Sequence, residues 1–142
     1  VYGSVWGVVG CRRMASGLRD GIEAMHEFDV EGRLLTDVGG TLPSSVLSTP
    51  GMISMMERTA SMLVYPELDE GKATVGFEVC VKHVAAAPEG TRCTARARLE
   101  QIVEGRKLRF AVEVVADDGR TIGVGTHERR IVDVRVDRAP AA

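Results

Sequence analysis

Three side chains of the sequence have the chemistry of a nucleophile, a base and an orienting group. Thr49 carries a hydroxyl, His83 an imidazole and Glu57 a carboxylate. In such a set the carboxylate fixes the tautomer of the imidazole, and the imidazole takes a proton from a hydroxyl or a water. The three residues are far apart in the sequence, so their types alone do not show that they meet.

Each of these residues also has a structural interpretation. Thr49 precedes Pro50, which is typical of a helix start where the hydroxyl caps the first turn. Glu57 follows two methionines, and it either lies buried and paired or faces solvent. His83 ends an apolar strand, where a histidine is often structural. His127, near the end of the chain, fits a surface position equally well.

The apolar pattern predicts one long helix and several strands around these residues. The helix begins near Thr49 and is stopped by Pro66. Apolar and polar residues alternate in five segments, which we predict to be strands: 22–30, 74–84, 91–104, 108–114 and 120–136. Turn residues at 104–106 and 117–119 separate the last three segments. The order predicts an α+β domain in which a helix packs on an antiparallel sheet and the last four strands follow one another as hairpins.

Composition narrows the classes of function. The chain has 142 residues, 27% of them charged, and a net charge of −2, so nothing favours nucleic acid or an acidic membrane as a partner. Cys11, Cys80 and Cys93 show no metal-ligand spacing, and we expect reduced thiols in a cytoplasmic protein with neither metal nor cofactor. We expect one domain over 14–142, preceded by a poorly ordered extension over 1–13.

The sheet predicts self-association. One Met-rich helix is the only element available to cover the apolar face of five strands, and it is too short to cover both ends. The apolar surface left over would be exposed in a monomer. We therefore expect a homodimer.

Three motifs in this order carry a resemblance to a known family. They are STPGMISMME at 48–57, VGFEVCVKHVAAAPEG at 75–90 and GVGTHER at 123–129. Together they resemble the fluoroacetyl-CoA thioesterase family of hotdog-fold proteins, and the similarity runs from about Leu18 to Val134.

The resemblance implies a hotdog fold, a long helix wrapped by an antiparallel sheet, with active sites at a dimer interface. It implies that Thr49, Glu57 and His83 form the catalytic set for hydrolysis of an acyl-CoA thioester. It places Gly76 on the substrate side of the site and Arg129 near the bound acyl-CoA. In this interpretation His83 is the base or the acyl acceptor, Glu57 orients or assists it, and Thr49 binds or activates the attacking group.

The segment ahead of the helix departs from the family pattern. Family members that discriminate for a fluorinated acyl group carry a phenylalanine in this lid, whereas residues 31–47 contain none. We therefore expect a generic short acyl-CoA as the substrate. Two other functions fit a hotdog domain: a non-catalytic acyl-CoA-binding module, and an enoyl-CoA hydratase. The closely spaced Asp and His that we would expect of the hydratase ahead of the helix are absent.

Overall fold

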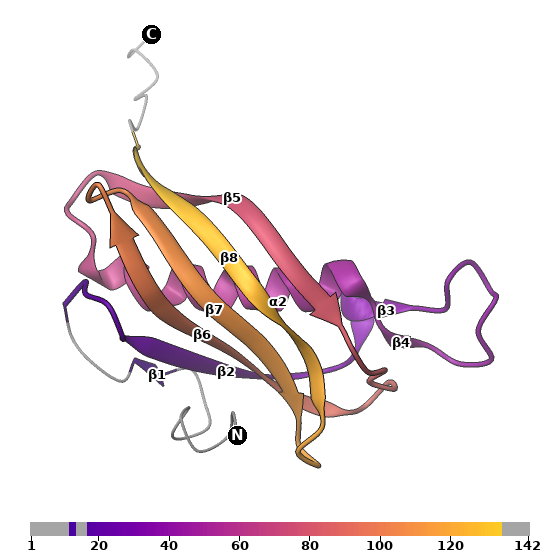
Figure 1. Cartoon of the computed structure of the whole chain (residues 1–142). Coiled ribbons are helices and arrows are strands. Elements are labelled where there is room, and N and C mark those ends of the chain that lie inside the picture. The colour runs from indigo at the N-terminus through magenta and orange to yellow at the C-terminus, as the bar shows by residue number, and fades with distance from the viewer. Residues whose placement is uncertain (1–11, 14–16, 135–142) are drawn as a thin grey trace, which may run out of the picture.

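A computed structural model describes residues 12–13 and 17–134 of the chain, and it shows one long helix lying against a six-stranded antiparallel sheet (Figure 1). The helix is α2 (Thr49–Val64). The six strands, given in their spatial order, are β1 (Arg12–Arg13), β2 (Glu23–Asp29), β6 (Arg92–Val103), β7 (Lys107–Ala116), β8 (Thr121–Asp133) and β5 (Lys72–His83). The predicted α+β class is confirmed.

The N-terminus of α2 differs from the prediction in one residue. Ser48, and not Thr49, is the N-cap, because the Ser48 side chain accepts a hydrogen bond from the backbone N–H of Gly51 at 2.9 Å. Thr49 is the first helical residue and Pro50 the second. Ser48 satisfies one of the free backbone N–H groups of the first turn, that of Gly51. The hydroxyl of Thr49 is therefore not needed as a cap and is available for another partner.

The core lies between α2 and the inner face of the sheet. The strands predicted from alternation at 91–104 and 108–114 are confirmed, and alternate residues along them face the core: Cys93, Ala95, Ala97 and Leu99, and Leu108, Phe110, Val112 and Val114, are each at most 1% exposed. The helix contributes the methionines and small residues of its buried face. The buried residues of the core include Met52, Met56, Ala60 and Leu63 of α2, Cys93, Ala95, Ala97 and Leu99 of β6, and Leu108, Phe110, Val112 and Val114 of β7.

The strand order corrects the expected series of hairpins. β6, β7 and β8 do follow one another as hairpins, but β5 pairs with β8 instead of β6. Residues 84–91 cross the end of the sheet, where Ala87 accepts a hydrogen bond from the backbone of Leu47 at 2.8 Å. Alternation within a strand does not encode its neighbour, so this crossing was missed. As a result, β5 is an outer strand of the sheet with one unpaired edge (Figure 1).

Strand β5 also contains an irregularity that alternation did not predict. Its register against β8 shifts between Gly76 and Glu78, so Phe77 is an extra residue in the strand. The alternation predicted for 74–84 is therefore interrupted. Val75 and Phe77 are 49% and 59% exposed, and the guanidinium of Arg130 lies 3.6 Å from the centre of the Phe77 ring. An apolar outer strand of this kind is unusual on a monomer surface.

The segment ahead of α2 is only partly a loop. It contains a short 3₁₀ helix, η1 (Gly32–Leu34), and a two-stranded ribbon of β3 (Leu35–Thr36) and β4 (Val46–Leu47). The ribbon and its exposed tip extend away from the sheet (Figure 1). A second 3₁₀ helix, η2 (Tyr65–Glu67), follows α2 directly and contains the predicted stop residue Pro66.

The predicted N-terminal extension lies mostly outside the described residues. Arg12 and Arg13 pair with Met25 and Ala24 of β2, while residues 1–11 are not described. Cys11 lies in that segment, and Cys80 and Cys93 are free thiols. None of the helices in the described part of the chain is long and apolar enough to cross a membrane.

Candidate active site

The first pair of predicted site residues meets at the N-terminus of the helix. Thr49 begins α2 and His83 ends β5, and the Oγ1 of Thr49 lies 2.8 Å from Nδ1 of His83. The two residues are 34 positions apart in the sequence, and only the antiparallel packing of the strand beside the helix brings them together. We call them the Thr49–His83 pair. The distance is suitable for proton transfer between a hydroxyl and an imidazole.

Burial sets the protonation state of this imidazole. It lowers the pKa of His83 below the ordinary value for histidine, against a smaller opposing effect of the Ala85 backbone. The neutral ring is therefore the dominant form at neutral pH. A neutral imidazole beside a hydroxyl has the protonation state that a general base requires.

Glu57 lies eight residues further along the helix and has a different set of neighbours. Its Oε2 is 3.6 Å from Nη1 of Arg129 and 4.0 Å from Nε2 of His127, both of which belong to β8. The Glu57 side chain is 38% exposed, so the structure lies between the two predicted alternatives, buried and solvent-facing. The burial is partial, and a cation balances the carboxylate.

Gly76 makes room for this carboxylate. A Cβ at position 76 would lie 2.5 Å from Oε2 of Glu57 and 3.6 Å from Nη1 of Arg129. Because of the register shift that follows it, Gly76 faces the helix even though it lies seven residues before His83. We call Glu57, Gly76, His127 and Arg129 the Glu57 cluster.

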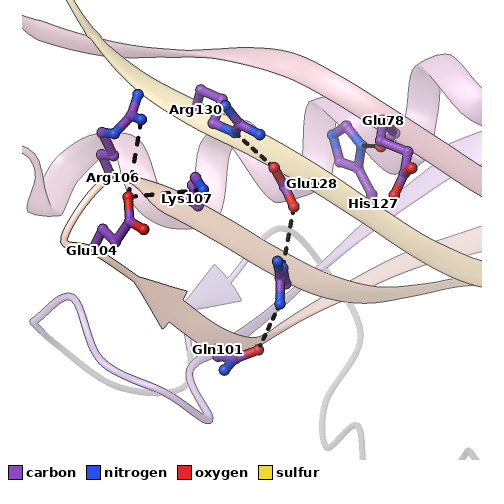
Figure 2. Close-up of polar contacts among 9 residues, drawn as sticks. Glu78, Gln101, Glu104, Arg106, Lys107, His127, Glu128 and Arg130 are labelled. Carbon is purple, nitrogen blue, oxygen red and sulfur yellow. Dashed lines mark hydrogen bonds and ion pairs between the residues drawn. The ribbon is translucent and has the colours of Figure 1, made fainter.

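His127 is a buried member of this cluster, which the sequence left undecided. It is 2% exposed, and its ring stacks on Phe110 with 6.0 Å between the ring centres. Its Nδ1 lies 2.8 Å from the backbone oxygen of Glu78 (Figure 2). Burial, helped by the nearby charge of Arg129, lowers the pKa of His127, while the Glu78 hydrogen bond and Glu57 act in the other direction. The alternation of Gly125, His127 and Arg129 was the available signal, because all three belong to one face of β8.

A separate network of charges covers the opposite face of the same strands. Glu128 accepts hydrogen bonds from Nε of Arg130 at 2.6 Å and from Nε of Arg109 at 3.1 Å. Arg109 in turn donates to Gln101, and Figure 2 shows this chain of contacts on the side of the sheet away from α2. These hydrogen bonds lower the pKa of Glu128 and keep its carboxylate ionised. The network joins β6, β7 and β8 and is separate from both parts of the candidate site.

A single chain brings the predicted residues together in two groups and leaves a gap between them. Thr49 and Glu57 are eight residues apart on α2, which corresponds to about 12 Å along the helix axis. Within the part of the chain that the structure describes, no hydrogen bond or ion pair joins Glu57 to Thr49 or His83. Among the residues that the structure describes, no three or more histidine, cysteine or carboxylate side chains are grouped so that they could hold a metal ion.

The long helix packed on an antiparallel sheet is the architecture of a hotdog-fold thioesterase, and comparisons with known proteins agree. The family model for fluoroacetyl-CoA-specific thioesterase matches residues 30–135. A fluoroacetyl-CoA thioesterase from Streptantibioticus cattleyicolor is 35% identical over 128 residues, which cover 84% of this chain and 88% of that protein. The chain therefore belongs to the fluoroacetyl-CoA-specific thioesterase family and is a thioester hydrolase.

Solved structures of relatives support the same fold. A single-residue variant of a fluoroacetyl-CoA-specific thioesterase in complex with fluoroacetate and CoA is 31% identical, with a TM-score of 0.73 over 82% of this chain and 96% of that one. A thioesterase superfamily member from Thermus thermophilus is also 31% identical, with a TM-score of 0.73 over 81% of this chain and 84% of that one.

Proposed function

We propose that this protein hydrolyses the thioester of a short-chain acyl-CoA, with Thr49, His83 and Glu57 as its catalytic residues. The observation that carries the proposal is the 2.8 Å contact between the Thr49 hydroxyl and His83 at the start of α2. A described relative with bound fluoroacetate and CoA supports an acyl-CoA as the substrate class. The absence of phenylalanine from residues 31–47 argues for a generic short acyl group over a fluorinated one.

The chemistry follows from the protonation states of the pair. When the proton of neutral His83 is on Nε2, Nδ1 accepts a hydrogen bond from the Thr49 hydroxyl. His83 then takes the proton as the Thr49 oxygen, or a water held by it, attacks the thioester carbonyl. Collapse of the tetrahedral intermediate breaks the carbon–sulfur bond, and the CoA thiolate leaves with the proton from His83. When water is the nucleophile, this step releases the carboxylic acid directly. When the Thr49 oxygen is the nucleophile, an acyl-threonine ester forms, and a water from which His83 again takes the proton hydrolyses it to the acid and free Thr49. Free backbone N–H groups at the start of α2 are suited to the developing oxyanion.

We also propose that a second copy of the chain completes the site. In the proposed dimer two β5 strands pair antiparallel along their outer edges. The register that closes the gap places the two-fold axis near Cys80, about midway between Gly76 and His83. That axis would bring the partner subunit's His83 opposite Gly76 and beside Glu57. It would also cover the exposed side chains of Val75 and Phe77. The gap between the two groups of residues in one chain would thereby be closed.

The direct test is thiol release from a panel of acyl-CoA esters: acetyl, fluoroacetyl, propionyl, butyryl and benzoyl. We expect turnover of the short esters, with at most a modest preference for fluoroacetyl-CoA. His83→Ala and Glu57→Gln should each lower kcat by about 100- to 10,000-fold, the usual contribution of general acid–base groups. Both variants should keep the elution volume and circular dichroism of the wild-type protein.

Four results would contradict parts of the proposal. Tight binding of CoA esters without release of thiol would indicate a binding module, and addition of water to an enoyl-CoA would indicate a hydratase. A monomeric mass in solution for the active protein would exclude a site shared between subunits. If Glu57→Gln instead prevents folding, Glu57 is a structural residue and its catalytic assignment is wrong.

A further inference from the structure

Strand β5, whose outer edge is unpaired, carries two charged side chains on the face away from α2 (Figure 1). Glu78 stands opposite Glu128 of β8, which belongs to the network on that face, and Lys82 shares the face because it lies four residues further along. Both side chains are exposed. Within the part of the chain that the structure describes, neither side chain makes a hydrogen bond or an ion pair. The two charges are therefore available to a second molecule.

The spacing of these charges is symmetric about Cys80, an exposed residue midway between them on the same face. A two-fold axis normal to the sheet at Cys80 would join the outer edges of two β5 strands antiparallel, with opposed residues on the same face and about 5 Å apart. Glu78 would then lie opposite the partner's Lys82, and Lys82 opposite the partner's Glu78. On the face toward α2, Val79, which is 37% exposed, would lie opposite the partner's Val81. The edge is thus complementary to itself.

Other registers leave these charges unsatisfied. Opposed residues must share a face, so the next possible axes stand at Val79 and at Val81. With the axis at Val79, Lys82 would face the partner's Val75. With the axis at Val81, it would face the partner's Cys80. Charge complementarity therefore selects the axis at Cys80.

The bulge in β5 makes this register align the site as well. Phe77 is the extra residue, so Gly76 is one pairing step from Glu78. The partner's His83 directly follows the residue opposite Glu78, and it would therefore stand opposite Gly76 on the face toward α2. A Cβ at Gly76 would lie 2.5 Å from Oε2 of Glu57, so the imidazole would arrive beside that carboxylate. Without the bulge, Phe77 would take the place of Gly76.

We infer that Glu78 and Lys82 form two symmetric ion pairs with a second copy of the chain, and that these pairs set the register that aligns the shared site. This inference rests on the dimer of the proposed function. Exposed ion pairs contribute little to affinity, whereas like charges placed directly opposite each other disfavour a pairing. Glu78 and Lys82 thus determine which register forms, and the apolar contacts of the edge supply the affinity.

The dimerisation test reverses the two charges one at a time. In Glu78→Lys every pair would contain two lysines, and in Lys82→Glu two glutamates. Each variant should keep the wild-type circular dichroism and dimerise about 10- to 100-fold more weakly in sedimentation at low salt. The double variant Glu78→Lys/Lys82→Glu should recover the wild-type dimer. Arg92→Glu is the matched control, because it reverses an exposed charge on the same face in β6, away from the edge, and dimerisation should not change.

A mixture of the two single variants gives the sharpest result. The chain with two lysines would meet the chain with two glutamates, and both pairs would be restored only in the heterodimer. An equimolar mixture should therefore dimerise with an affinity within about threefold of wild type, although each variant alone does not.

The same mixture reports on the alignment of the site. Glu57→Gln is added to the Glu78→Lys chain, and His83→Ala to the Lys82→Glu chain. One of the two sites in the heterodimer then keeps both Glu57 and His83. Thiol release should return to about half the wild-type rate in the mixture, while each chain alone stays inactive.

The results separate this inference from the proposed function. If the mixture gains no dimer over its components, or if the single reversals leave dimerisation unchanged, the ion pairs are absent and the inference is wrong. Heterodimers without thiol release, when the wild type is active, would show that the register does not align a shared site, which overturns the second part of the inference. A wild-type protein that dimerises as expected but hydrolyses no acyl-CoA would refute only the proposed hydrolysis, since the dimerisation measurements do not depend on turnover.

Discussion

Thr49 and Glu57 lie about two turns apart on α2, and each belongs to one of the two groups of site residues. The Thr49–His83 pair and the Glu57 cluster are built in opposite ways. The pair consists of two residues at the ends of two elements, joined by one contact of 2.8 Å. The cluster contains a half-buried carboxylate, a buried imidazole and a buried guanidinium, and hydrogen bonds to β5 hold the last two in place.

This difference indicates how the two groups divide the work of the site. A group that moves a proton needs a hydroxyl that is free of structural duties, and Thr49 has one because Ser48 caps the helix. A group that supplies charge needs a fixed position, and hydrogen bonds to β5 give one to His127 and Arg129 beside Glu57. We therefore expect substitutions in the cluster to affect turnover through geometry, and substitutions in the pair to affect it through proton transfer.

The largest effect expected from this comparison is that of Gly76→Ala. The new Cβ would lie 2.5 Å from Oε2 of Glu57, and the carboxylate is the far end of a flexible side chain that can swing away. We expect kcat to fall about 100-fold, as for an ångström-scale displacement of a catalytic group. The free energy of unfolding, measured with urea, should change little.

Gly123→Ala is the contrasting control, because its Cβ would overlap Sδ of Met52 in the core. Overpacking of a core typically costs about 1–3 kcal/mol, so this variant should lose stability while the folded protein keeps most of its kcat. If Gly76→Ala loses stability to the same extent and keeps its turnover, the cluster is structural.

A smaller effect on kcat is expected from substitution of Thr49, the residue that follows the helix cap Ser48. Thr49→Val removes the hydroxyl beside His83 and keeps the shape. With Thr49 holding the attacking water, kcat should fall about tenfold, the value of roughly one hydrogen bond in the transition state. Loss of all measurable turnover would instead identify the Thr49 oxygen as the nucleophile. Thr49→Ser should restore most of the turnover. Thiol release measures both.

Ser48→Ala should show the reverse behaviour. It removes the cap on Gly51 and should lower the free energy of unfolding by about 1 kcal/mol, with kcat within about twofold of wild type. A loss of turnover in Ser48→Ala equal to that in Thr49→Val would remove the distinction between capping and catalysis at this helix start.

The smallest expected effect is a displaced pH profile. Burial lowers the pKa of His83, and a general base acts only when it is neutral. Turnover should therefore be complete at neutral pH and be lost as pH falls through a midpoint below about 6.5, the ordinary histidine value. A profile of kcat between pH 4.5 and 8 measures the midpoint. A midpoint above 7 would contradict the assignment of His83 as the base.

Much of the architecture was predictable because it depends on local patterns. Alternation of apolar and polar residues predicts which side chains of β6 and β7 are buried, and the glycines at 105 and 119 predict the hairpin turns at 104–106 and 117–119. In the structure Glu104 and Gly105, the two central residues of the turn closed by the hydrogen bond from Arg106 to Val103, both have positive φ. The helix was equally clear from its start signal and the Met-rich run.

The errors fall where position depends on distant contacts. Thr49 and Ser48 are both good capping residues, and only the course of the backbone decides that Ser48 caps. The bulge at Phe77 and the pairing of β5 with β8 have no local signal either. These two features turn Gly76 toward Glu57 and leave an apolar edge exposed.

By itself the sequence determined the class of fold, the buried side chains of β6 and β7, and the residue types of the site. Hydrophobic periodicity and turn chemistry are local properties, so they can be read from the sequence. Only the tertiary structure decided which of those residues meet. It joined Thr49 to His83 and placed His127 and Arg129 behind Glu57. The physical reason is that strand order, register and burial are set by contacts between distant segments, and these contacts also fix the pKa of each histidine.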